Sequence, residues 1–207
     1  MKFVNNSLPE KLNSYLDEIY NNEELKDAFD DCDIEFNDEE WLDDIINNED
    51  EWKEDFEGGE YNYDAKPFAS SADGGLWVIL NNQLVGYIGT EGECGIVARN
   101  IDEFMNIVAA CKGCIFDIDI LESEESFIDE LNERNEENDY TDVFEDFMNK
   151  HGFEKNPKEV YKMVKLGLTV KPFFIIRATD DEYEDSYSLL GSDDGQEALE
   201  EFIRDCL

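Results

Sequence analysis

The sequence predicts a fold of the α+β class, in which strands follow one another along the chain and helices flank them. Two observations lead to this prediction. Between residues 76 and 98, three runs rich in β-branched, aromatic and aliphatic residues follow each other, with turn-forming residues between them. On both sides of this stretch, apolar residues recur every three or four positions, which is the spacing of one helix face. The predicted order around residues 76–113 is therefore strand, turn, strand, turn, strand and helix.

The first predicted helix begins near Ser7 in the stretch "SLPEKLNSYLDEIY". Ser7 and Glu10 have the spacing of a capping box, and Pro9 falls in the first turn, where proline is tolerated. The residues expected on its buried face are Leu8, Leu12, Tyr15, Leu16 and Ile19.

Residues 23–60 are densely acidic, yet large apolar side chains are threaded through them. Within this block, "DEEWLDDIINN" predicts a helix that starts at Asn37 or Asp38. Trp41, Ile45 and Ile46 would share a face with Leu42. The acidic residues of its first turn suit the positive end of the helix dipole.

The predicted strands occupy the least charged part of the chain. "LWVIL" and "LVGYIG" are joined by "NNQ", which is good turn chemistry, and "EGECGIVA" continues as a further turn and strand. Residues 74–89 contain no Asp, Glu, Lys or Arg. Because a buried unpaired carboxylate is costly, we expect both strands of this hairpin to lie in the interior of the sheet.

The clearest helix is predicted over "RNIDEFMNIVAACKG", where Asn100 and Glu103 form a capping pair and Gly113 stands where a glycine would end the helix. The rest of the chain reads as helices followed by two short strands. The helices are expected in "ESFIDELNERN", "YTDVFEDFMNKHG", "NPKEVYKMVKLG" and "SDDGQEALEEFIRDCL", and the strands in "VKPFFIIRA" and "DSYSLLG". Lysines gather near the third of these helices, at Lys155, Lys158, Lys162, Lys165 and Lys171.

Charge is the strongest compositional signal. The 207 residues include 55 Asp and Glu against 16 Lys and Arg, a formal net charge of −39, while aromatic residues make up 13%, which argues against disorder. Nucleic acids and anionic membranes are polyanions, so both are excluded as direct partners. A basic protein partner is favoured. The alternative is that the acid serves solubility or reflects a saline habitat. With no apolar leader or membrane-spanning run, we expect a cytoplasmic protein.

No motif predicts an enzyme, a metal or a cofactor. Gly74 and Gly75 precede a strand and match neither phosphate-binding glycine pattern. The single histidine, His151, has no nucleophile at a recognisable spacing and is expected at a helix end beside acids. Cys111 and Cys114 form a CxxC pair that could be redox-active or half of a zinc site, but the five cysteines are expected to be free thiols. Acidic pairs are too frequent to indicate a catalytic or calcium site.

Several short motifs together resemble the SUKH superfamily, which includes a yeast regulator of cell-wall synthesis and many bacterial immunity proteins. An "LP" helix start precedes "PFASSADGG", then a "VGYI" hairpin and a "VARNIDEFM" step from strand to helix, over roughly residues 5–112. The matching residues are Leu8, Pro9, Pro67, Phe68, Ala69, Asp73, Gly74, Gly75, Val85, Gly86, Ile88, Ala98, Asn100, Phe104 and Met105.

The resemblance implies a mixed or antiparallel sheet flanked by helices, in one domain over residues 1–207 with a core at about 5–112 and a largely helical extension. It implies no enzymatic activity and, in bacteria, an immunity protein that neutralises a cognate toxin, often a nuclease, by direct binding. The alternative is a regulatory scaffold with several partners. The acidic block places the expected contact surface at Trp41, Asp43, Asp44, Trp52 and Asp55.

Overall fold

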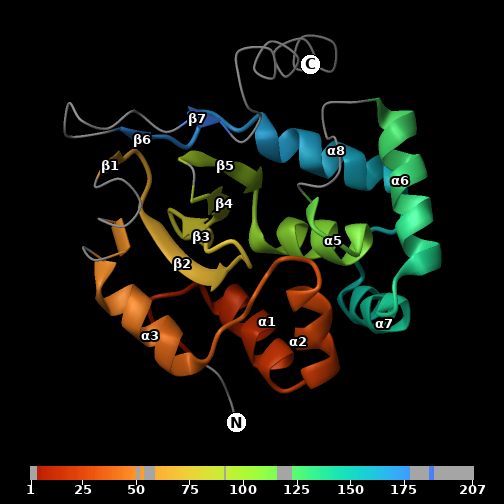
Figure 1. The fold of residues 1–207 in the computed structure, drawn as a ribbon, viewed down its shortest axis with the longest axis horizontal. Coiled ribbons are helices and arrows are strands. Elements are labelled where there is room, and N and C mark those ends of the chain that lie inside the picture. Colours follow the sequence, from red (N-terminus) through yellow and green to blue (C-terminus); the bar gives the residue numbers. More distant parts are fainter. Residues whose placement is uncertain are drawn as a thin grey trace.

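The computed structural model confirms the α+β class (Figure 1). It describes residues 4–49, 52–53, 59–90, 92–115, 123–177 and 187–188. The helices in this part are α1 (Glu10–Tyr20), α2 (Glu23–Asp30), α3 (Glu39–Asn47), α5 (Ile101–Cys111), α6 (Glu124–Glu137), α7 (Thr141–His151) and α8 (Pro157–Leu168). The strands are β1 (Glu60–Tyr61), β2 (Ala65–Ser70), β3 (Leu76–Leu80), β4 (Leu84–Ile88), β5 (Glu93–Ala98), β6 (Ile176–Arg177) and β7 (Tyr187–Ser188).

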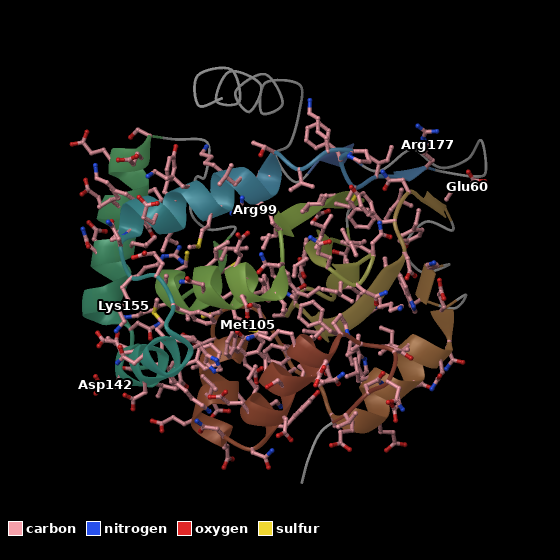
Figure 2. The ribbon with its side chains drawn as sticks, turned by 180° about the vertical axis from the view of Figure 1, so that it is seen from behind. Glu60, Arg99, Met105, Asp142, Lys155 and Arg177 are labelled. Atoms are coloured by element: carbon pink, nitrogen blue, oxygen red, sulfur yellow. The ribbon has the colours of Figure 1, made fainter. Side chains whose placement is uncertain are left out.

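The main sheet has the order β2-β3-β4-β5-β7. Neighbouring strands from β2 to β5 are antiparallel, and β7 runs parallel to the start of β5, so the sheet is mixed. A small second sheet pairs β1 with β6. Figure 2 shows Glu60 and Arg177, which face each other in that pairing, at one edge of the molecule, with Asp142 and Lys155 at the opposite edge. The two late strands therefore join different sheets and do not pair with each other, as a late strand pair would require.

The charge-free hairpin lies in the sheet interior, as predicted. All five residues of β3 are buried, and β3 and β4 each have a strand on both sides. Asn81 and Asn82 connect them with φ angles of 49° and 58°. Consecutive left-handed residues give the turn twist that matches two antiparallel strands, and asparagine tolerates this conformation better than most residues.

Two apolar cores lie on opposite faces of the sheet because side chains alternate along each strand. Trp77 and Ile79 point into the larger core, which the helices α1, α2, α5, α7 and α8 fill. Leu76, Val78 and Leu80 point into the smaller one. The helices after residue 123 thus pack on the same core as those before the sheet.

The turn between β2 and β3 is held by a network of polar side chains around Asp73. Its Oδ1 accepts hydrogen bonds from the Gly75 amide (3.1 Å), the Tyr87 hydroxyl (3.2 Å) and the Ser71 hydroxyl. A side chain at position 75 would collide with Tyr87, since an added Cβ would lie 2.2 Å from its hydroxyl oxygen. This glycine therefore serves close packing, as the absence of a phosphate-binding pattern led us to expect.

The β2 edge of the main sheet is protected against further strand pairing. Ser70 of β2 exchanges two backbone hydrogen bonds with Glu35, and Pro67, which has no amide proton, also lies in β2. Toward the opposite side of the sheet, α8 packs against β5, the strand next to the edge strand β7. The backbone of α8 comes so close at Gly167 that an added Cβ would lie 2.1 Å from the Val97 carbonyl oxygen.

Two predicted helix ends were wrong. The first helix begins at Glu10 with Pro9 as its N-cap and no side-chain cap. Instead of Ser7, Asn13 satisfies the nearby backbone, donating to the carbonyls of Asn5 and Leu8. At the end of α5 the left-handed residue is Lys112 (φ 51°) and not the adjacent glycine. Gly113 instead makes room for the Arg134 side chain, whose Nη1 would lie 2.6 Å from an added Cβ.

The structure adds three elements that the sequence analysis did not identify, α2, β1 and β2. The predicted helix at 192–207 lies outside the described residues.

Candidate functional site

The candidate site is the solvent-facing surface of α3, which begins where predicted. Asp38 is the N-cap, and its carboxylate accepts a hydrogen bond of 2.8 Å from the Trp41 amide. This cap and the acidic first turn explain why so acidic a segment is helical. The exposed carboxylates of the surface are Asp38, Glu39, Glu40, Asp43 and Asp44. We call these five residues, together with Trp41, the α3 surface.

Trp41 ties the α3 surface to the interior. Leu42 is completely buried, whereas Trp41 and Ile45 are half-buried and pack against both apolar cores. Trp41 therefore presents part of an indole ring to solvent between carboxylates. A partly exposed aromatic residue inside a charged rim is the composition found at the centre of protein interfaces.

Among the described residues, none of the five carboxylates of the α3 surface lies within ion-pair distance of a lysine, arginine or histidine. The hydrogen bonds that they accept come from neutral groups, such as the 2.9 Å bond from Asn5 Nδ2 to Asp43 Oδ1 and the 2.8 Å bond from Asn48 Nδ2 to Asp44 Oδ1. Residues 23–49 contain thirteen Asp and Glu against one lysine, so the surrounding chain adds to the negative potential.

The lysines around α8 are paired, in contrast. Lys158 Nζ lies 2.9 Å from a Glu124 oxygen, and Lys162 Nζ lies 2.6 Å from a Glu159 oxygen. Lys165 is buried, with its ammonium group 5.3 Å from the centre of the Tyr161 ring. The lysines of the basic cluster predicted from the sequence thus contact carboxylates or aromatic rings, and among the described residues none of them pairs with a carboxylate of the α3 surface.

The field of the α3 surface acts on a neighbouring tyrosine. Burial raises the pKa of Tyr20, and the nearby Glu39 and Asp38 carboxylates raise it further, because each disfavours a second negative charge. The Tyr20 hydroxyl donates to the Asn37 carbonyl just before α3 begins. This tyrosine therefore stays a neutral donor that fixes the start of the helix.

The predicted contact residues do not all reach the surface. Trp41, Asp43 and Asp44 lie on α3 as expected, whereas Trp52 is only 5% exposed and packs edge-on against Tyr61 in the smaller core. Trp52 is thus a core residue and does not belong to the exposed surface where it was predicted. Asp55 lies outside the described residues.

The sequence analysis also missed three members of the α3 surface: Asp38, which it gave only as a helix start, and Glu39 and Glu40. For the two glutamates there was a helix-face signal in the sequence, because each stands four residues before one of the predicted aspartates and therefore shares its helix face.

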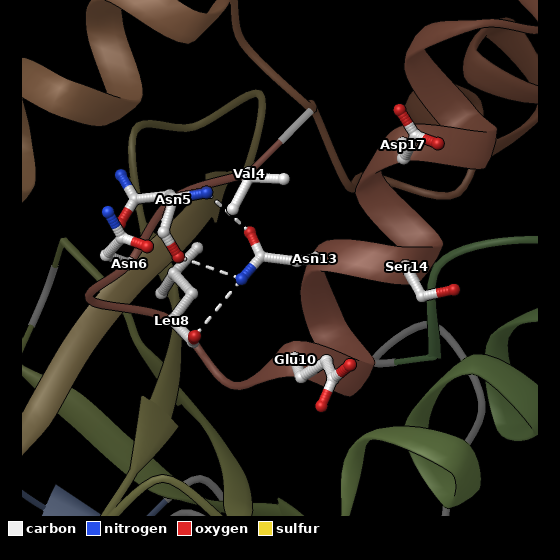
Figure 3. A pocket seen from close by; sticks show the side chains of 8 residues that line it. All are labelled: Val4, Asn5, Asn6, Leu8, Glu10, Asn13, Ser14 and Asp17. Atoms are coloured by element: carbon white, nitrogen blue, oxygen red, sulfur yellow. Dashed lines mark hydrogen bonds between the residues drawn. The ribbon is translucent and has the colours of Figure 1, made fainter. Parts of the chain in front are cut away.

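A hollow of about 410 Å³ lies beside the start of α1 (Figure 3). Its wall contains Asn5 and Asn13, both buried, which bind each other through two hydrogen bonds of 2.8 Å. The amide groups are therefore used to fasten the N-terminal segment to α1. Because its buried amides already have partners, we assign this hollow a structural role.

The thiols and the histidine occupy structural positions. Cys32, Cys94, Cys111 and Cys114 are free, and burial raises the pKa of Cys111 to about 12, so this thiol is a poor nucleophile. Within the described residues, no group of three His, Cys, Asp or Glu side chains could hold a metal ion. His151, at the end of α7, lies 2.8 Å from a Glu18 oxygen and stacks against Phe153.

Comparison with models of protein families, with curated proteins and with solved structures finds no match for this chain. None of the helices in the described part of the chain combines the length and the apolar character needed to cross a membrane.

Proposed function

We propose that this chain is a non-enzymatic binding protein that holds a basic protein partner on its α3 surface, and that it is an immunity protein of the SUKH type. It would neutralise a cognate toxin by direct binding in the cytoplasm. The observation that carries the proposal is the set of five exposed carboxylates around half-buried Trp41, without a cationic partner among the described residues.

The charge argument selects the partner class. Unpaired carboxylates on one surface attract a basic protein from a distance and raise its association rate, whereas they repel nucleic acids. A toxin that binds nucleic acid must itself be basic around its active site, because it holds phosphates. An acidic inhibitor can therefore compete for the same basic surface that holds the toxin's substrate.

The resemblance narrows the partner from any basic protein to a toxin. The matching positions include Asp73 and Gly75 in the β2–β3 turn, Gly86 in β4, and Asn100 with Phe104 at the start of α5. Most are buried or hold a turn or a helix cap, so they support a shared framework. The α3 surface lies between the matched segments and would carry the recognition of an individual toxin.

The test uses the toxin candidate encoded beside this gene. We expect a tight complex whose association rate falls by about tenfold or more between about 0.05 M and 0.5 M NaCl, since screening removes the long-range attraction. Stopped-flow mixing measures this rate. The variant Glu40→Gln/Asp44→Asn should lower the rate at low salt.

A matched control removes the same two charges elsewhere. Asp129 and Glu133 are exposed, lie four residues apart on α6, and form no ion pair with a described residue. The variant Asp129→Asn/Glu133→Gln should bind nearly as fast as the natural chain. An equal loss in both variants would show that net charge matters and the α3 surface does not. Weak capture of many host proteins, with no tight toxin complex, would instead favour the regulatory scaffold.

A further inference from the structure

α3 is the least buried of the helices that flank the sheet. Of its nine residues, only Leu42 is completely enclosed, whereas nine of the eleven residues of α5 are buried. A helix of this length does not persist in water by itself, because helix nucleation is costly and few hydrogen bonds follow it. The helical state of α3 therefore depends on its docking against the cores.

The charges of α3 oppose this docked helix. Glu39 and Asp43 stand four residues apart, as do Glu40 and Asp44, so two pairs of like charges face each other along the surface. Asp44 also lies in the last turn, near the negative end of the helix dipole, and no basic residue occupies that turn. The acidic residues of the first turn lie near the positive end of the helix dipole and stabilise the helix. The unfavourable electrostatic interactions are therefore concentrated toward its C-terminal half.

The polar contacts of α3 are also unequally distributed. Just before the helix, Asn37 donates a 2.8 Å hydrogen bond to Ser70 Oγ and accepts one from Tyr20 at its carbonyl. In the first half, Asp43 accepts the hydrogen bond from Asn5. Beyond Asp43, docking of the helix rests on half-buried Ile45 and Ile46, and the Asp44 carboxylate accepts a hydrogen bond of 2.8 Å from Asn48, its neighbour along the chain. The start of α3 is thus fastened by polar contacts with other segments, whereas its C-terminal half is held by two half-buried isoleucines, with buried Trp52 as the next core contact along the chain.

We propose that α3 is a flap whose docking depends on ionic strength. At low ionic strength, repulsion among its carboxylates opens the helix from its C-terminal half. Cations in solution screen this repulsion and close it. A basic partner would act in the same direction, but the flap is a property of the chain alone and does not depend on the proposed function.

Hydrogen exchange of individual backbone amides tests the flap without any partner. We expect the protection of amides 43–47 to rise about two- to fivefold between about 0.02 M and 0.5 M NaCl, the range given by two screened like-charge pairs. The amides of α5 should not change. In the variant Glu40→Gln/Asp44→Asn, one of the two like-charge pairs is gone, so protection of these amides at low salt should already exceed that of the natural chain, and their remaining rise with salt should be smaller.

The α6 variant Asp129→Asn/Glu133→Gln distinguishes local repulsion from net charge. It removes the same charge from a site away from α3 and should leave the salt dependence of amides 43–47 unchanged. The flap is overturned if these amides exchange equally at both salt concentrations, if α5 responds as strongly as α3, or if the α6 variant protects α3 as well as the α3 variant does. None of these outcomes bears on toxin binding, which is measured separately.

Discussion

The β3–β4 hairpin and α3 are opposite in charge content and burial, although both belong to one strongly acidic chain. The hairpin, residues 76–88, contains no charged residue, and every residue of β3 is buried. In α3, four of nine residues are Asp or Glu, and only Leu42 is completely buried. The two segments also differ in their glycines and caps, since Gly86 packs the hairpin whereas α3 depends on the Asp38 cap.

The difference shows where this chain can carry its charge. A carboxylate without a partner is costly inside the sheet, so the hairpin excludes it. On the surface each carboxylate costs little alone, but repulsion accumulates when several share a helix face. The hairpin is therefore constrained by packing and indicates the fold, while α3 is free to specify a partner at some expense of its own stability.

Two tryptophans give the largest test of this comparison. Trp77 is completely buried, contacts the rings of Tyr87 and Phe104, and donates a 3.0 Å hydrogen bond to the Asp33 carbonyl. Trp77→Ala should lower the free energy of unfolding by about 3–5 kcal/mol, because it leaves a cavity. Trp41→Ala in α3 should lower it by about 1–2 kcal/mol, since less apolar surface is lost. Urea unfolding measures both, and equal losses would contradict the distinction.

The second largest loss of stability is expected for a variant in the β2–β3 turn, which precedes the hairpin. Asp73→Ala leaves the buried Ser71 and Tyr87 hydroxyls without their shared acceptor and should lower the free energy of unfolding by about 1–2 kcal/mol at neutral pH. The pKa of Asp73 is depressed, chiefly because the Ser71 hydroxyl donates to its carboxylate. A depressed folded pKa stabilises the native state above the unfolded value, near 3.8, and that stabilisation disappears as the pH falls through the folded value.

The pH dependence supplies the control for this variant. The difference in unfolding free energy between Asp73→Ala and the natural chain should be constant above about pH 5 and shrink toward pH 2. A difference that is the same at all pH values would mean that the carboxylate charge contributes nothing and that only packing at the turn was lost.

Two of the side-chain helix caps, those of α3 and α5, provide a matched pair of variants with smaller expected effects. Asp38 caps α3 by accepting from the Trp41 amide, and Asn100 caps α5 by accepting from the Glu103 amide. Replacing either by Ala removes about 1 kcal/mol from its own helix. Because α5 is part of the main core, Asn100→Ala should lower the global unfolding free energy fully. Asp38→Ala should act mainly on exchange of the α3 amides. If both variants lowered the global free energy of unfolding equally, α3 would unfold together with the main core and not separately from it.

The sequence predicted the elements whose cause is local. Asn100 and Asp38 mark helix starts because a short polar side chain reaches its own helix amides. Asn81 and Asn82 mark the hairpin because few residues tolerate two left-handed positions in succession. The α3 surface could be located for the same reason, since the acids around Trp41 follow the helix period.

The elements that depend on distant contacts were not predicted. The acids of α2 conceal its buried Leu25 and Phe29, which contribute to the core only because α2 lies against α1 and α7. Gly113 led us to predict the end of a helix, but the position lacks a side chain because Arg134 of α6 packs against it. Trp52 stands among acidic residues in the sequence, as Trp41 does. Only the folded structure shows that Trp52 belongs to the smaller core, where it packs edge-on against Tyr61, while Trp41 lies half-buried beside both cores.

The variant with the smallest expected effect, Asp44→Asn, is the one that should stabilise α3, whereas the variants above destabilise the protein. Asp44→Asn removes one like-charge pair and a negative charge from the last turn of α3, so it should raise the free energy of unfolding of α3 by about 0.2–0.5 kcal/mol at low salt. The gain should fade as salt screens the repulsion, and amide exchange resolves it. The same variant should slow association with a basic partner. A change that stabilises the helix and weakens binding would show that this carboxylate is kept for recognition at the expense of stability. A variant that stabilises α3 without slowing association would separate the two roles and leave Asp44 outside the binding surface.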